Sequence, residues 1–143
     1  ALSGDFIVGC PGESEAELAD TLKLVDEVRY AACFSFKFSP RPGTPAATME
    51  GQVAADVMDD RLQRLQARIA AHQLAFNEAS LGKTCTVLVE RRGRHPGQWL
   101  GKSPWLQSVH FAGDHAIGDL VEVELAAAGP NSLSGRVRAA VAV

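Results

Sequence analysis

A local cluster of cationic side chains, with tryptophans nearby, lies in the second half of the sequence. One short segment holds Arg91, Arg92, Arg94 and His95. Further residues of these two kinds are Trp99, Lys102, Trp105, Arg136 and Arg138. Cationic groups bind phosphates, and aromatic rings stack on unpaired bases, so this pattern is typical of a nucleic-acid interface. A solvated arginine loop, with one of the tryptophans in a protein core, explains the same pattern.

Two short turns in the first half hold the other candidate groups. One turn contains Gly9, Pro11, Gly12 and Glu13, and a proline-rich segment contains Arg41. Glycines allow a flat ligand such as an adenine to approach the backbone closely, and arginine binds carboxylates or phosphates. The alternative is that the glycines and prolines only shape turns, that Glu13 favours a helix start, and that Arg41 is solvated. The pattern by itself favours this alternative.

The elements that must position these turns form a βαβ pattern. Residues 5–9 are an apolar run ending in glycine, which predicts a buried strand. Ser14 and Glu17 match a capping box, and apolar residues at helical spacing predict a helix over 14–29. Phenylalanines alternate with polar residues over 33–38, which predicts a second strand. This order predicts parallel neighbouring strands with a right-handed crossover.

Each turn directly follows a predicted strand. Residues 10–13 follow the first strand, and residues 39–46, with three prolines, follow the second. The C-terminal ends of parallel strands meet at one edge, where α/β folds place their active sites. Two strands cannot close a sheet, so we expect the chain to be cut from a longer protein that supplies the remaining strands.

Residues 56–78 are predicted to form a long helix. Leu62, Leu65 and Ile69 recur at helical steps, Asp56 is the predicted N-cap, and Gly82 lies just past the end. We interpret this helix as a connector between two domains. An ordinary amphipathic helix packed on either neighbour fits the pattern equally well.

The remaining sequence predicts a small all-β domain. Glycines and prolines separate five short segments that we predict to be strands, at residues 84–90, 98–102, 107–111, 120–125 and 133–138. Five strands in about 60 residues are typical of a closed, OB-like barrel. Arg136 and Arg138 alternate on the last strand, so they should point to one face. The fold class is therefore α/β plus all-β, with predicted parts at residues 1–54, 55–81 and 82–143.

Composition limits the remaining classes of protein. Apolar residues make up 46 % of the 143 residues, which is enough for a folded core. Cys10, Cys33 and Cys85 are odd in number and lack metal-ligand spacing, which favours buried thiols in a reducing compartment. The histidines show no ligand spacing either. No apolar run reaches the roughly 20 residues of a membrane span, and no secretory signal is visible, so we expect a cytoplasmic protein without membrane contact.

Charge differs between the two halves. Residues 1–80 carry seven Lys and Arg against twelve Asp and Glu, a net charge of −5. Residues 81–143 carry seven against five, a net charge of +2. This difference indicates that the second half meets an anionic partner and the first half does not.

Several motifs resemble the MiaB family of tRNA methylthiotransferases, in order and over nearly the whole chain. They are DFIVGCPGE at 5–13, FSFKFSPRPGTPA at 34–46, RLQRLQ at 61–66, GKSPWLQSVHF at 101–111 and GPNSLSG at 129–135. Members of this family are radical S-adenosylmethionine enzymes with two 4Fe-4S clusters, and they add a methylthio group to isopentenyladenosine beside the tRNA anticodon. The resemblance implies that the chain ends a radical-SAM partial (β/α) barrel and continues into a TRAM domain that binds the anticodon stem-loop.

The resemblance also assigns roles to particular residues. The candidate residues for the S-adenosylmethionine site are Ile7, Gly9, Pro11, Gly12, Glu13 and Arg41, of which Arg41 is the best single candidate. The candidate residues for tRNA binding are Arg91, Arg92, Arg94, His95, Lys102, Ser103, Trp105, Arg136 and Arg138. The family usually has an aromatic residue at the position of Cys10.

The cysteine triad that holds the radical-SAM cluster is absent from the sequence, as are the three cysteines of the auxiliary cluster. We expect both sets upstream of Ala1 in a parent enzyme that is monomeric. Without a cluster no radical forms, so we expect this chain alone to be catalytically inactive.

Two alternatives remain. One is a non-catalytic RNA-binding module, which would have no use for the βαβ segment. The other is a related methylthiotransferase that acts on threonylcarbamoyl-adenosine or on a ribosomal protein.

Overall fold

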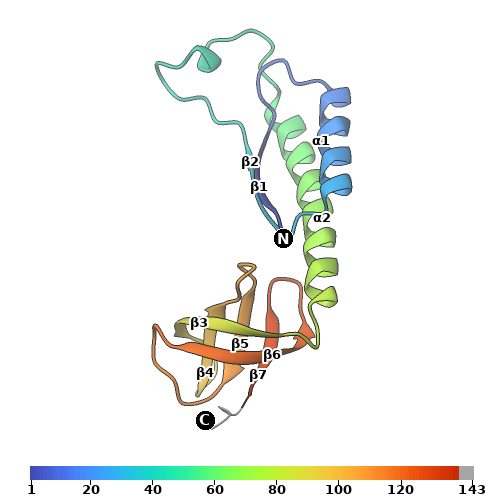
Figure 1. The fold of residues 1–143 in the computed structure, drawn as a ribbon. Coiled ribbons are helices and arrows are strands. Elements are labelled where there is room, and N and C mark those ends of the chain that lie inside the picture. The colour runs from blue at the N-terminus through green and yellow to red at the C-terminus, as the bar shows by residue number, and fades with distance from the viewer. Residues whose placement is uncertain (139–143) are drawn as a thin grey trace. The chain divides into compact units, whose positions relative to one another are not determined.

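The computed structural model describes residues 1–138 (Figure 1). It divides into two compact units, Ala1–Gln73 and Leu74–Val143, here called unit 1 and unit 2. Unit 1 is an α/β fold and unit 2 is a β-barrel. The long helix α2 (Ala55–Ala79) contributes residues to both units.

Unit 1 contains the predicted βαβ unit. Strand β1 (Ser3–Val8), helix α1 (Glu15–Val28) and strand β2 (Ala32–Lys37) follow one another along the chain. The two strands pair in parallel over all six positions of each. Their C-terminal ends therefore lie at one edge, and the loops that follow them leave from that edge.

Local hydrogen bonds set both ends of α1. The Glu17 backbone N–H donates to the Ser14 hydroxyl at 3.2 Å, and the Ser14 backbone N–H donates to the Glu17 carboxylate at 2.7 Å. The predicted capping box is thereby confirmed. The helix ends at Arg29, which has the left-handed φ of 53° that often terminates helices and donates its N–H to the Val25 carbonyl at 3.0 Å.

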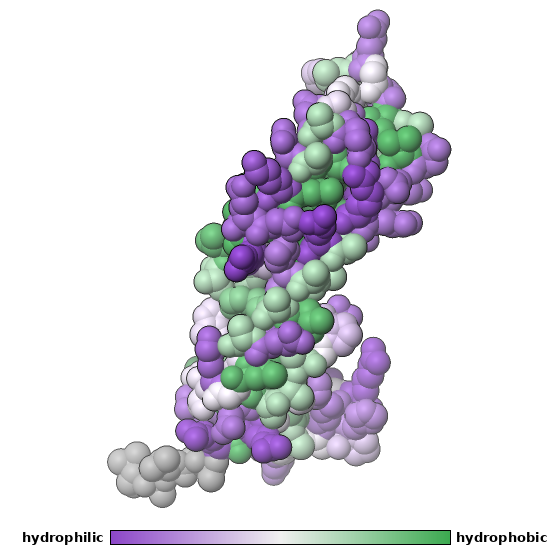
Figure 2. All heavy atoms as spheres, turned by 90° about the vertical axis from the view of Figure 1, so that its right-hand side faces the viewer, coloured by the Kyte–Doolittle hydropathy of each residue, from purple (hydrophilic) through white to green (hydrophobic). Residues whose placement is uncertain are grey.

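Apolar side chains of three elements form the core of unit 1. Val8 of β1, Leu18 and Val25 of α1, and Leu65 and Ile69 of α2 are buried together. Both helices lie on one side of the strand pair (Figure 1). Seen from that side, unit 1 presents mostly hydrophilic side chains to solvent (Figure 2). The first part of α2 is thus an amphipathic helix packed on the βαβ unit.

The opposite face of the strand pair is apolar and exposed. Ile7, Phe34 and Phe36 are exposed by 57 %, 69 % and 55 %, and Ile7 lies directly opposite Phe36 in the register. Parallel sheets usually carry covering layers on both faces. This face lacks such a layer in the described part of the chain.

Two details around α2 differ from the prediction. The helix begins at Ala55, so the prediction of Asp56 as N-cap is wrong, and the Ala54 carbonyl accepts the first helical hydrogen bond, from Met58, at 3.0 Å. Asp56 lies in the first turn, where a carboxylate still favours the helix dipole. A 3₁₀ helix, η1 (Pro45–Ala47), interrupts the segment that we expected to be loop throughout.

Unit 2 is a closed barrel of five strands, as predicted. The strands are β3 (Thr84–Arg92), β4 (Gln98–Lys102), β5 (Ser108–Ala112), β6 (Leu120–Ala128) and β7 (Leu133–Val137). Their order is β3-β4-β5-β7-β6, and β6 pairs with β3 to close the barrel. The β5–β7 pair is parallel and the other pairs are antiparallel. This topology is that of an OB-like Greek-key barrel.

Alternate residues of the strands fill the barrel. They include Val87, Val89, Trp99, Val109, Phe111, Val123, Leu125 and Leu133. The space inside is tight, because a Cβ on Gly135 would lie 2.1 Å from Val123 Cγ1. Outward positions on the same strands are thereby left to polar and cationic side chains.

A buried polar network joins the end of α2 to the loop between β4 and β5. The Gln107 side-chain amide donates to Asn77 Oδ1 at 2.9 Å and to Ser80 Oγ at 3.1 Å. The Ser103 hydroxyl donates to Gln107 Oε1 at 3.1 Å. All four residues are buried, so the last turn of α2 is part of the barrel unit.

Within residues 1–138, no helix combines the length and the apolar character that crossing a membrane requires.

Candidate functional site

One face of the barrel carries most of the predicted cationic residues. Outward side chains of β4 and β5 form rows, because Leu100 pairs with His110 and Lys102 with Ser108. A cavity of about 630 Å³ opens on this face. It is lined by Arg91, Arg92, Gly93, Arg94, His95, Gln98, Leu100, Ser108, His110, Pro130, Asn131 and Ser132. The lining comes from the C-terminal end of β3, from β4 and β5, and from the loops β3–β4 and β6–β7.

Gln98 organises the cationic loop between β3 and β4. Its side-chain Oε1 accepts the backbone N–H groups of Arg94 at 2.9 Å and of His95 at 3.3 Å. Its backbone carbonyl accepts the Gly93 N–H at 2.7 Å. One glutamine thus holds three successive amides, while the side chains of Arg94 and His95 remain exposed.

Trp99 lies inside the barrel and offers no open stacking face there. It is 6 % exposed, and its indole N–H donates to the Gly113 carbonyl at 3.0 Å. The Arg92 guanidinium lies 5.0 Å from the ring centroid. Of the two explanations for this tryptophan, packing in the core is the one that the structure shows.

The end of β4 and the segment after it contain three predicted RNA-binding residues in different settings. Lys102 lies on the outward row, with its ammonium donating to Ser108 Oγ at 2.8 Å. Ser103 is 3 % exposed and its hydroxyl is used within the turn, so direct contact with a ligand would require the turn to open. Trp105 is partly buried against the barrel core, with the Lys83 ammonium 5.8 Å from its ring centroid.

Arg136 and Arg138 lie apart from the residues that line the cavity. Arg136 is opposite Glu124 in the β6–β7 register, and Arg138 Nε lies 3.6 Å from Glu124 Oε2. Both arginines are exposed. The exposed pair of Arg138 with Glu124 contributes little to stability, so it leaves Arg138 able to exchange partners at the surface.

Sequence reasoning missed eight of the twelve residues that line the cavity. Gln98, His110, Asn131 and Ser132 were not among the predicted site residues, although they line the cavity. The alternation of β4 and β5 placed Gln98 and His110 on the outward face with Lys102, and this signal could have identified them. Asn131 and Ser132 lie in a loop that no periodicity connects to β4.

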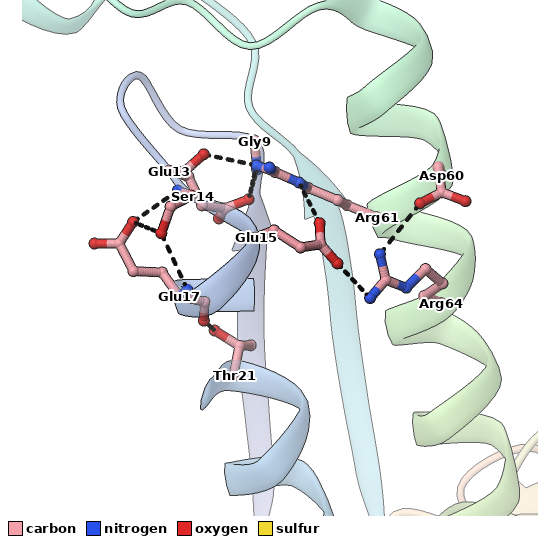
Figure 3. Close-up of polar contacts among 9 residues, drawn as sticks. All are labelled: Gly9, Glu13, Ser14, Glu15, Glu17, Thr21, Asp60, Arg61 and Arg64. Atoms are coloured by element: carbon pink, nitrogen blue, oxygen red, sulfur yellow. Dashed lines mark hydrogen bonds and ion pairs between the residues drawn. The ribbon is translucent and has the colours of Figure 1, made fainter. Parts of the chain in front are cut away.

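The turn after β1 is held by a charged pair that the sequence did not indicate. The Glu13 Oε1 atom accepts the Gly9 backbone N–H at 2.9 Å (Figure 3). Arg61 of α2 donates through Nη1 to the same oxygen at 2.8 Å and to the Glu13 backbone carbonyl at 2.9 Å. The side chains of Arg61 and Glu13 are only 7 % and 14 % exposed. Glu13 therefore acts inside the turn, and one of its oxygens is already occupied.

The other predicted residues of this edge are open to solvent. Ile7 and Arg41 are exposed, and a Cβ on Gly12 would have no neighbour within 4 Å. Pro11 is partly buried. The Gly12 N–H donates to the Gly51 carbonyl at 2.8 Å, and the Arg41 carbonyl accepts the Thr44 N–H at 3.2 Å. The two loops thus present a backbone edge and one cationic side chain.

Nearby surface carboxylates are stabilised in their charged form. The hydrogen bond from Arg64 lowers the pKa of Glu15, and the hydrogen bond from the Ser14 backbone lowers the pKa of Glu17.

Burial raises the pKa of the Cys33 and Cys85 thiols. Across residues 1–138, no three His, Cys, Asp or Glu side chains gather as metal ligands would.

Known proteins match the chain in two ways. Residues 78–137 match the model of the TRAM domain. The chain is 72 % identical over 142 residues to the tRNA-2-methylthio-N(6)-dimethylallyladenosine synthase of Erythrobacter litoralis (strain HTCC2594). This alignment covers 99 % of the chain and 32 % of the relative. The chain is 73 % identical over 137 residues to the protein of this name from Novosphingobium aromaticivorans, covering 96 % of the chain and 31 % of the relative. A third protein of this name, from Agrobacterium fabrum, is 53 % identical over 138 residues. The chain spans about a third of the length of these relatives.

Proposed function

Because the chain is homologous over nearly its whole length to tRNA methylthiotransferases and contains a TRAM domain, as the MiaB-type motifs indicated, we propose that it is the tRNA-binding C-terminal part of such an enzyme. The parent enzyme would add a methylthio group to C2 of isopentenyladenosine beside the anticodon. In this proposal unit 2 binds the anticodon stem-loop, and unit 1 supplies part of the rim of the S-adenosylmethionine site.

The cavity on the β4–β5 face is the observation that carries the tRNA-binding role. In OB-type barrels, nucleic acids bind on the second and third strands and between the first and fourth loops. The corresponding elements here are β4, β5 and the loops β3–β4 and β6–β7, and together with the end of β3 they line the cavity. Arg91, Arg92 and Arg94 bring positive charge to its edge, and the amides and hydroxyls of the other lining residues can bond to unpaired bases.

The edge of unit 1 has features that fit an adenine and a charged tail. Ile7 offers an exposed apolar side chain, Gly12 leaves its surroundings open, and Arg41 can bind a carboxylate. Gly9, Pro11 and Glu13 shape the turn between them. When bound to a reduced cluster, S-adenosylmethionine would supply the radical that activates C2 of the adenine base. The residues of this chain would bind and orient it.

The cluster ligands would come from other parts of the parent enzyme. The bare apolar face of β1 and β2, with Ile7, Phe34 and Phe36, is consistent with further strands packing there. We therefore assign the two 4Fe-4S clusters and the catalytic chemistry to the parent enzyme and not to this chain alone.

Titration of a tRNA anticodon stem-loop onto the chain, at salt concentrations from about 50 to about 200 mM, tests the role of unit 2. We expect the affinity to fall steeply with salt, because binding releases counterions from the phosphates. Replacing Arg91 or Arg94 by Ala should weaken binding and lower the slope of log affinity against log salt by about one for each lost phosphate contact.

A matched control is Lys23→Ala, which removes one exposed cation of α1 that pairs with Glu27. It should leave the affinity and the salt slope unchanged. Equal effects of Lys23→Ala and Arg91→Ala would show that binding is not organised by the cavity face, and would contradict the proposal.

A further inference from the structure

We propose that Arg61 is a positioning residue that fixes the turn at residues 9–13 from helix α2. The inference rests on the proposed role of this turn in the S-adenosylmethionine rim. It extends the cofactor site to Arg61, which lies 48 positions from Glu13 in the sequence. Arg61 is not itself predicted to contact the cofactor.

Arg61 binds the turn through two different groups. Its Nη1 donates to the Glu13 carboxylate at 2.8 Å and to the Glu13 backbone carbonyl at 2.9 Å (Figure 3). The same carboxylate oxygen accepts the Gly9 N–H at 2.9 Å. The chain Arg61–Glu13–Gly9 thereby ties the end of β1 to the start of α1 and to α2. Planar guanidinium groups suit such fixed geometry better than a lysine does.

The same part of the chain approaches the turn at two more points. A Cβ on Gly9 would lie 2.3 Å from Met58 Cγ, so Met58 packs directly over this glycine. The Gly12 N–H donates to the Gly51 carbonyl at 2.8 Å. Residues 51–61 therefore hold both ends of the turn, and Arg61 supplies the charged contact among them.

A contribution to stability does not by itself explain why an arginine is buried at position 61. Arg61 is 6 % exposed, its Nε has no hydrogen-bond partner, and the nearest second carboxylate, of Glu15, is 3.7 Å from that atom. Burying an ion pair costs desolvation energy that well-packed apolar side chains avoid. What a buried contact from one guanidinium nitrogen to two acceptors adds is one defined geometry, and here that geometry belongs to the turn.

Hydrogen exchange measured by NMR on the 143-residue chain tests the positioning role. In Arg61→Gln we expect the Gly9 amide to exchange at least about tenfold faster, because Glu13 loses the partner that holds it in place. Arg61→Lys keeps the charge and should restore part of the protection. Arg64→Gln is the matched control, since Arg64 lies one turn further along α2 and bonds only to the exposed carboxylates of Glu15 and Asp60.

Affinity for S-adenosylmethionine, measured on the full-length protein with its clusters loaded, tests the link to the cofactor. Arg61→Gln should raise the dissociation constant roughly tenfold, with partial rescue by Arg61→Lys, and should leave the affinity for the stem-loop RNA unchanged. Should Arg61→Gln fail to fold, Arg61→Lys and Glu13→Gln give the same comparison, because both retain part of the contact.

The outcomes separate the two claims. Equal Gly9 exchange in Arg61→Gln and Arg64→Gln would overturn the positioning role. A loosened turn with unchanged affinity for S-adenosylmethionine would overturn the assignment of this turn to the cofactor rim, and with it this inference. The tRNA-binding role of the barrel would stand or fall by its own titration.

Discussion

Gln98 and Gln107 show how single uncharged side chains organise the barrel of unit 2. Gln98 holds the backbone of the cationic loop, and Gln107 connects the end of α2 with the turn after β4. Neither forms an ion pair, yet each orders backbone or side-chain groups on which the candidate RNA-binding face depends. A buried amide such as that of Gln107 is costly to replace, because its buried partners lose hydrogen bonds that water cannot restore.

Replacing Gln107 by Leu should lower the free energy of unfolding by about 1–3 kcal/mol. The change keeps a similar volume but leaves Asn77 Oδ1 without its donor and Ser103 Oγ without its acceptor. Urea denaturation of the chain measures the loss. Thr86→Val is the control, since the Thr86 hydroxyl bonds Glu122 only at the surface, and its effect should stay within about 0.5 kcal/mol. Equal stability of the two variants would argue against a structural role for the network.

At the scale of elements, charged groups connect α1 with α2 outside the apolar core. Asp26 of α1 accepts from His72 Nε2 at 2.8 Å and also pairs with Arg68, and both partners lie on α2. The hydrogen bond from His72, together with the charge of Arg68, lowers the pKa of Asp26 below its ordinary value of 3.8. These contacts add to the apolar core of unit 1, in which Leu18 of α1 and Leu65 of α2 are both buried.

The lowered pKa gives a pH dependence with a definite sign. Because the folded state favours the charged carboxylate, Asp26 contributes its stabilisation above the unfolded pKa and loses it as pH falls through the lower folded pKa. Asp26→Asn should therefore lower the melting temperature at about pH 7, and the difference from the unchanged protein should vanish at about pH 2. Thermal melts by circular dichroism measure this, with Asp20→Asn on the same helix as control. A difference that persists undiminished in acid would contradict the assignment.

At the scale of the whole molecule, the chain combines two units with separate cores. The five buried residues of the apolar core cluster of unit 1 come from β1, α1 and α2, whereas the barrel strands supply the core of unit 2. The match to the TRAM domain begins at residue 78, and the structural division places the boundary at Leu74. The predicted division at residue 82 stays a prediction. It would separate Asn77 and Ser80 from Gln107.

A polypeptide of residues 74–143 should unfold cooperatively and at a higher temperature than one of residues 82–143. The longer polypeptide retains the buried contacts of Asn77 and Ser80 with Gln107, which the shorter one lacks. Differential scanning calorimetry of the two polypeptides checks this. Adding Gln107→Leu to both should remove most of the difference, and an unchanged difference would show that the network is not its cause.

Much of the fold followed from local patterns in the sequence. The capping box at Ser14, the parallel strands around α1 and the five alternating strands of the barrel were all predicted from residues within single elements. Periodicity succeeds there because it reports which face of one helix or strand avoids water. The cationic loop around Arg94 was likewise visible as a cluster in the sequence.

The tertiary structure alone decided which side chains meet. The contact of Arg61 with Glu13 and the placement of Asn131 beside the cationic loop join segments that no local period relates. Burial also distinguished among the cationic, aromatic and polar residues that the sequence grouped together. Trp99 lies in the barrel core, and Ser103 is buried in a turn. Local patterns set which face of an element is buried, but partners across the chain depend on how the elements pack, and that packing is a property of the whole folded unit.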